Sequence, residues 1–78
     1  MKYTLTVVSE NKPGVLYRVV GIFVRKRLNI ESLAVAEVNR ETHLSRYRIV
    51  LNCTADTARK AAAQIDHIVE VLSVGIGG

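Results

Sequence analysis

The hydrophobic period of this sequence switches between the spacing of a strand and that of a helix, and the order of these switches restricts the chain to few folds. Residues 3–8 alternate apolar and polar side chains, which is typical of a strand with one buried face. From residue 14 to about residue 27, apolar side chains recur three and four positions apart, which indicates an amphipathic helix. Extended character returns over residues 30–38, and the polar residues 39–43 suit a hairpin loop.

The second half of the chain continues with a strand, a helix and a strand. Residues 45–52 alternate cleanly between two faces, so they predict a strand that pairs with the one before it. Residues 55–67 are rich in alanine and other good helix formers, and residues 69–74 read as a last strand. The glycine-rich residues 75–78 predict a flexible end.

The resulting β-α-β-β-α-β order predicts the fold class. Each strand–helix–strand half is a parallel crossover, and such crossovers are right-handed. Two interleaved crossovers produce a four-stranded antiparallel sheet with both helices on one face, which is the α+β, ferredoxin-like arrangement. We therefore predict a single domain over residues 1–78, with one face of its sheet uncovered.

Composition excludes several classes of protein. A chain of 78 residues buries roughly 62% of its unfolded surface, which leaves a thin core and favours association with a partner. No apolar run is long enough for a membrane span, and Cys53 has no second cysteine to pair with, so we expect a cytoplasmic protein that does not contact membrane. Cys53, His43 and His67 are too few and too scattered for a metal site, and no acid/base pair is visible.

The segment from Glu10 to Leu16 is the best candidate for a ligand-binding site. It ends a strand, turns, and begins a helix whose free N–H groups form a small anion site. Gly14 lets the backbone approach a ligand, and the Asn11 amide offers both a donor and an acceptor, which suits an amino acid zwitterion. The same residues also suit a helix start with no ligand, so both readings stay open at this point.

Two segments carry a resemblance to a known family. They are the β-strand exit Glu10-Asn11-Lys12-Pro13-Gly14-Val15-Leu16 and the run Asn29-Ile30-Glu31-Ser32-Leu33. Together they resemble ACT domains and, more narrowly, the regulatory small subunits of acetolactate synthase (acetohydroxyacid synthase). The similarity runs from about residue 3 to residue 74, and the length resembles the short, single-domain form of that subunit.

The resemblance implies a regulatory role without catalytic activity. Members of this family bind and activate the catalytic subunit and confer feedback inhibition by valine or a related branched-chain amino acid. Thiamine diphosphate, magnesium and FAD would then belong to the catalytic partner. The family's domains form homodimers by joining their sheets, with effectors between them. Carried onto this sequence, the implied effector-binding residues are Asn11, Pro13, Gly14, Val15, Leu16, Asn29, Ile30, Leu33 and Val35.

Simpler interpretations exist for some of these residues. Asn29 suits a left-handed turn after the helix, and Ile30, Leu33 and Val35 suit core packing. Arg27 and Leu28 stand where the family usually has glycine and an aromatic residue, so we expect the loop before Asn29 to be shaped differently.

Two other functions compete with this reading. An ACT domain could serve a different enzyme or a transcription regulator as its amino acid sensor. An RNA-binding domain has the same topology, but it stacks bases on strand aromatics. Tyr3 and Tyr47 are the only strand aromatics and are expected on the helix-packed face, so we predict no nucleic acid partner. Two basic clusters could dock an acidic partner: residues 25–27, and Arg46 with Arg48 on the uncovered sheet face.

Overall fold

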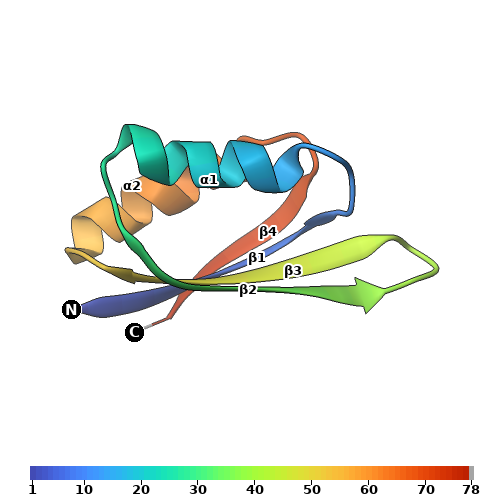
Figure 1. The fold of residues 1–78 in the computed structure, drawn as a ribbon, viewed down its shortest axis with the longest axis horizontal. Coiled ribbons are helices and arrows are strands. Elements are labelled where there is room, and N and C mark those ends of the chain that lie inside the picture. Colours follow the sequence, from blue (N-terminus) through green and yellow to red (C-terminus); the bar gives the residue numbers. More distant parts are fainter. Residues whose placement is uncertain (78) are drawn as a thin grey trace.

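The computed structural model describes residues 1–77, and its elements follow the order expected from the sequence (Figure 1). They are β1 (Lys2–Glu10), α1 (Val15–Arg25), β2 (Ile30–Asn39), β3 (Leu44–Asn52), α2 (Ala55–Asp66) and β4 (Val71–Gly77). The sheet order is β2-β3-β1-β4, and every neighbouring pair is antiparallel. Both helices cover one face of the sheet (Figure 1). The predicted α+β, ferredoxin-like class is confirmed.

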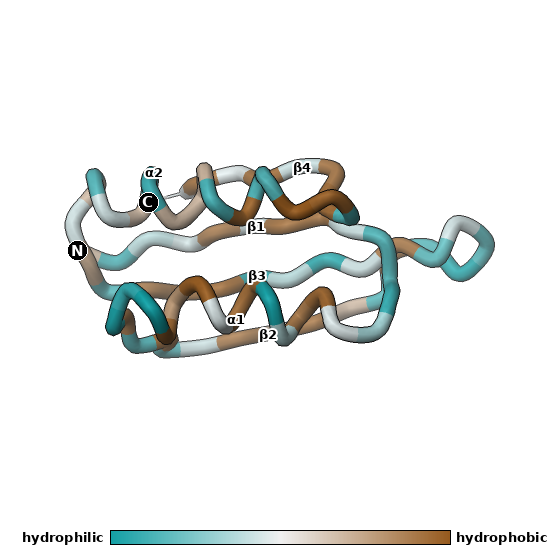
Figure 2. Tube along the Cα trace, turned by 90° about the horizontal axis from the view of Figure 1, so that it is seen from above, coloured by the Kyte–Doolittle hydropathy of each residue, from teal (hydrophilic) through white to brown (hydrophobic). Residues whose placement is uncertain are grey.

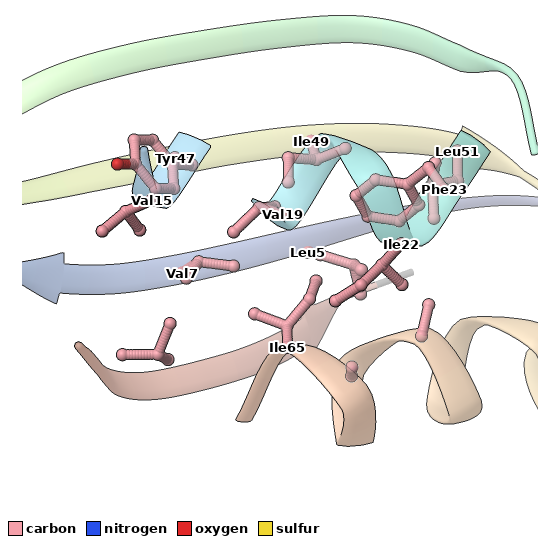
Figure 3. Packing of buried hydrophobic residues seen from close by; sticks show 13 residues of the cluster. Leu5, Val7, Val15, Val19, Ile22, Phe23, Tyr47, Ile49, Leu51 and Ile65 are labelled. Carbon is pink, nitrogen blue, oxygen red and sulfur yellow. The ribbon is translucent and has the colours of Figure 1, made fainter. Parts of the chain in front are cut away.

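The core lies between the sheet and the helix layer. In Figure 2 α1 runs above β3 and β2, and α2 runs above β4 and β1. Leu5, Ile49, Leu51, Phe23 and Ile65 are among its largest fully buried side chains, and Figure 3 shows them converging from four elements. The buried face of α2 consists mostly of alanine, so this helix can lie close to the sheet, as its narrow stripe of small residues predicts.

Two strands have ends that differ from those the hydrophobic pattern predicts. The sequence places the end of the first strand at residue 8, but β1 continues to Glu10 because Ser9 and Glu10 pair with residues of β3. The last strand begins at Val71 instead of residue 69, since Val69 lies in a turn and is 91% exposed. Backbone pairing, which side-chain hydrophobicity does not record, sets these boundaries.

The glycine-rich end differs from its prediction. Gly75 and Gly77 belong to β4 and pair with Thr6 and Thr4 of β1, so the expected flexible end is wrong for residues 75–77. Residue 78 lies outside the described residues. Ladder hydrogen bonds to β1 explain why glycines, which disfavour strands on their own, are held in one here.

The connection from α1 to β2 has a strained residue. Arg27 adopts a left-handed conformation with φ 57°, and the Leu28 N–H donates to the Phe23 carbonyl at 2.9 Å, which closes the helix end. An L-residue in this region costs about 1–2 kcal/mol relative to the right-handed conformation. Arg27 therefore takes the left-handed backbone conformation in which glycine is the usual residue, and whether the loop differs in shape from that of the family stays a prediction.

Two negative findings apply to residues 1–77. No helix in this part of the chain is both long and apolar enough to cross a membrane. The same residues contain no group of three or more histidine, cysteine or acidic side chains that could hold a metal ion.

Candidate functional site

The β1–α1 loop is fixed in place by its neighbours on both sides. The Asn11 N–H donates to the His43 carbonyl at 2.6 Å, and the Glu10 N–H donates to the Glu70 carbonyl at 2.9 Å. The hairpin between β2 and β3 thus holds one side of the loop, and the start of β4 holds the other. A loop anchored in this way presents its side chains and amides at fixed positions.

Gly14 occupies the N-cap position of α1 in a left-handed conformation, with φ 87°. A Cβ built on Gly14 would meet no atom within 4 Å, so glycine is required by the backbone conformation and not by crowding. The same open space leaves the backbone of this turn accessible from solvent.

The start of α1 keeps its amides free. Gly14 offers no side-chain cap, and the first turn contains no acidic residue. Within residues 1–77, the N–H groups of Leu16 and Tyr17 have no hydrogen-bond acceptor. The start of α2 is different, because the Thr54 hydroxyl accepts from the Thr57 N–H at 3.2 Å and Asp56 supplies an acidic group. The N-terminus of α1 therefore offers unpaired donors and the positive end of a helix dipole.

The predicted residues of the β1–α1 segment lie together at this helix start. Asn11, Pro13 and Gly14 are exposed, and the Asn11 side chain makes no hydrogen bond within the part of the chain that the structure describes. Leu16 is half-buried against the core. The Val15 side chain is completely buried, so Val15 can contribute only its backbone to a ligand.

Asn29 and Ile30 lie at the other end of α1. A helix of 11 residues is roughly 16 Å long, so a single small amino acid cannot contact both Asn11 and Asn29 of one chain. Ile30 is half-buried and packs against the core, as its simpler interpretation predicts, whereas Asn29 is exposed. The fold of one chain therefore does not bring the two halves of the predicted site together.

Leu33 and Val35 lie on the free edge of the sheet. They pair with Ile49 and Tyr47 of β3, so they point toward the helix side, but they remain 41% and 50% exposed. Core packing within this chain is therefore the wrong interpretation for both residues. β2 is an edge strand, and these side chains form part of an apolar margin that no element of residues 1–77 covers.

The sequence did not reveal one ion pair beside the loop. Arg18 of α1 lies 2.7 Å from Glu70, and the Glu70 side chain is only 19% exposed. The hydrogen bond from Arg18 is the main cause that holds the pKa of Glu70 below its ordinary value of 4.5. The backbone carbonyl of Glu70 also accepts from the Glu10 N–H. The ion pair therefore connects α1 to the end of β1, where the β1–α1 loop begins. The two residues are 52 positions apart, so no local pattern could have indicated the pair.

Removing the charge of Glu70 is expected to change the pH dependence of stability. The folded state favours the carboxylate, so its stabilisation is complete above pH 4.5 and is lost as the pH falls through the lowered folded pKa. We expect Glu70→Gln to lower the melting temperature at pH 7, and the difference from the unsubstituted chain to shrink below pH 4.5. Melting curves between pH 3 and 7 measure this. Glu41→Gln, at the exposed hairpin tip, is the control, and an equal pH-independent loss in both variants would contradict the prediction.

The strand aromatics are placed as expected. Tyr47 is buried beneath α1, near Val15 in Figure 3, and Tyr3 pairs with Leu51 on the same helix-packed side. Neither ring is presented on the uncovered face, where an RNA-recognition domain would stack bases. A separate groove of about 700 Å³ lies between α1 and α2, and none of the nine predicted site residues lines it.

The family model and the related sequences agree on one family. The family model described as AHAS small subunit-like ACT domain matches residues 5–73. A probable acetolactate synthase small subunit of Archaeoglobus fulgidus is 42% identical over 74 residues, which cover 95% of this chain and 46% of the relative. The acetolactate synthase small subunit of Haemophilus influenzae is 39% identical over 74 residues, which cover 95% of this chain and 45% of the relative.

A solved structure leads to the same family. The acetolactate synthase small subunit of Thermotoga maritima superposes with a TM-score of 0.85 at 30% identity, covering 97% of this chain and 47% of that chain. The chain thus spans just under half the length of these relatives. With the fold, the family model and these relatives in agreement, the chain belongs to the family of acetolactate synthase small subunit-like ACT domains.

Proposed function

We propose that this chain is a non-catalytic regulatory subunit of acetolactate synthase that binds and activates the catalytic subunit and senses valine, leucine or isoleucine for feedback inhibition. The observation that carries the proposal is the uncapped start of α1, which follows in the same loop as Asn11; within residues 1–77 the Leu16 and Tyr17 amides and the Asn11 side chain have no hydrogen-bond partner. Relatives named as acetolactate synthase small subunits support the identity of the partner. Thiamine diphosphate, magnesium and FAD then belong to the catalytic subunit, and both subunits work in the cytoplasm.

The chemistry of the loop suits a small apolar amino acid. The effector's carboxylate binds the Leu16 and Tyr17 amides at the positive end of the helix dipole. The Asn11 side chain binds the ammonium group through its amide oxygen. Glu10 and Lys12 already pair with each other at 3.1 Å, so the loop offers no free charge for a charged effector side chain. The aliphatic part of the effector then contacts apolar side chains of the margin.

A homodimer formed along β2 completes the site. Antiparallel pairing of β2 with β2 of a second protomer reverses the strand direction, so the start of one β2 lies beside the end of the other. Asn29 and Ile30 precede and begin β2, while its end lies near the loop that holds Asn11. The dimer therefore places these residues from one protomer near the α1 start of the other, and it covers the exposed Leu33 and Val35.

A thermal-shift panel of the purified chain against all twenty amino acids tests the effector site. At a hundredfold excess over the dissociation constant, binding adds about 2.7 kcal/mol, which raises the melting temperature of so small a domain by roughly 10–20 °C. We expect this shift with valine, leucine or isoleucine and its loss in Asn11→Ala. The matched control is Asn52→Ala, which removes an exposed asparagine at the end of β3 that lies away from the β1–α1 loop. This variant should retain the shift.

Activity measurements test the other half of the proposal. Adding the chain to purified acetolactate synthase catalytic subunit of the same organism should raise its rate, and valine should lower the rate only when the chain is present. A chain that shifts with amino acids but neither binds nor activates this subunit would be a sensor for another enzyme or a transcription regulator. Activation without any amino acid shift would reject the effector role alone.

A further inference from the structure

The uncovered face of the sheet carries most of its free charge on β3, while the other charged side chains that alternation places on it, Lys2 and Glu10, stand at the two ends of β1 and are ion-paired. Alternation places Thr6 of β1, Ala34 of β2 and Gly75 of β4 on this face, opposite the helix layer. Arg46 and Arg48 point from the same face of β3, and both are exposed. Two long guanidinium side chains therefore stand above a floor of small residues.

These two arginines have no partner within residues 1–77. Ion pairs are formed by Lys2, Lys12, Arg18, Arg40, Arg59 and Lys60. The remaining basic side chains fall into two groups, Arg46 with Arg48, and residues 25–27. The second group lies at the end of α1, where positive charge complements the helix dipole. Among the described residues, no helix end lies at Arg46 and Arg48 to provide such compensation.

The cross-strand neighbours of the pair show why it stays uncompensated. Arg46 lies opposite Val8 and Ala36, and Arg48 lies opposite Thr6 and Ala34. None of these neighbours carries a carboxylate. Because these neighbours are small, an approaching surface can reach both guanidinium groups from the open side, and each group can pair bidentately with a carboxylate.

We propose that the open sheet face docks an acidic surface of the acetolactate synthase catalytic subunit, with Arg46 and Arg48 as its central contacts. This proposal rests on the regulatory function proposed above and names the face that meets the partner. It also leaves the β2 edge and the β1–α1 loop free for the dimer and the effector, because those features lie at the sheet margin and on the helix side.

Two other occupants fit this face less well. A second copy packed sheet against sheet would bring the arginine pairs of both protomers together, and like charges at such an interface are unfavourable. Single-stranded RNA would meet basic charge but no aromatic ring, since Tyr3 and Tyr47 point to the helix side. An acidic protein surface matches the charge of the arginine pair without requiring an aromatic ring on this face.

Charge reversal at the two clusters tests the proposal. The affinity of the full chain for the purified catalytic subunit of the same organism is measured by biolayer interferometry at low and moderate salt. Arg46→Glu/Arg48→Glu is expected to weaken binding at least about tenfold and to flatten its salt dependence. Arg25→Glu/Lys26→Glu makes the same change in net charge at the other cluster and should bind within about threefold of the unsubstituted chain. Circular dichroism, sedimentation and the amino acid shift confirm the folded dimer in each variant.

A second measurement does not depend on charge reversal. Benzoylphenylalanine at position 36 of the open face should crosslink to the catalytic subunit, whereas the same group at position 63, on the outer face of α2, should not. The proposal is overturned if the unsubstituted chain binds but the Arg46/Arg48 variant binds equally well, or if position 63 alone crosslinks. Loss of the dimer in that variant, or arginine-dependent retention of a single-stranded RNA probe, would assign the face to a second copy or to RNA. If the unsubstituted chain does not bind, the proposed function itself fails.

Discussion

Truncating Phe23 to alanine is expected to remove a large part of the stability of this domain. Phe23 is fully buried and meets Leu51 and Ile22 beneath α1 (Figure 3). Loss of a buried phenylalanine costs about 3–5 kcal/mol, because the lost transfer free energy adds to the cost of the cavity. A domain of 78 residues has a free energy of unfolding of about 4–12 kcal/mol, so this one substitution lowers it by a large fraction.

Urea denaturation followed by circular dichroism measures the loss, at one protein concentration because dimerisation would add to apparent stability. Tyr17→Ala is the matched control, since Tyr17 is an aromatic residue of the same helix that is 83% exposed. We expect the control to change the free energy of unfolding by about 0.5 kcal/mol or less. A loss of less than about 1 kcal/mol for Phe23→Ala would mean that the helix layer does not pack on the sheet as described.

The sequence predicted the fold well because each element buries one face. The alternation that places Tyr47, Ile49 and Leu51 on one side of β3 is a direct consequence of the helix layer above them. The features that the sequence did not predict depend on backbone pairing. Ser9 is buried and Gly75 belongs to a strand because each lies beside another strand, and neither residue type indicates such a position. The same limit hid the ion pair between Arg18 and Glu70.

The candidate site was predictable only in part. The turn with Asn11 and Gly14 was visible as a strand exit followed by a helix start, which is a local pattern. The exposure of Leu33 and Val35 was not visible, because an alternating pattern says that two side chains share a face but not whether anything in the same chain covers it. The left-handed conformation of Arg27 was not predictable either, because arginine disfavours positive φ. The closing turn of α1 requires this conformation at position 27, whichever residue stands there.

Placing two lysines on the β2 edge is expected to abolish the dimer. Leu33→Lys/Val35→Lys changes side chains that are already 41% and 50% exposed, so the isolated domain should keep its fold. In the proposed dimer each protomer buries its own Leu33 and Val35 against the other protomer, so the double substitution changes four side chains at the interface. Four lost apolar contacts of about 1 kcal/mol each would weaken association by roughly 4 kcal/mol, which is about a thousandfold in the dissociation constant. Lysine on an edge strand also opposes further pairing by charge repulsion.

Sedimentation velocity over a range of concentrations measures this effect without any ligand. Leu72→Lys/Ile76→Lys is the matched control, because these residues lie on β4, the other edge strand, and are 58% and 43% exposed. A dimer that survives in the β2 variant but dissociates in the β4 variant would place the interface on the opposite edge. Asn29 would then have no route to the β1–α1 loop of the second protomer. Loss of the dimer in the β2 variant, together with loss of its response to amino acids, would instead mean that the effector site requires both protomers.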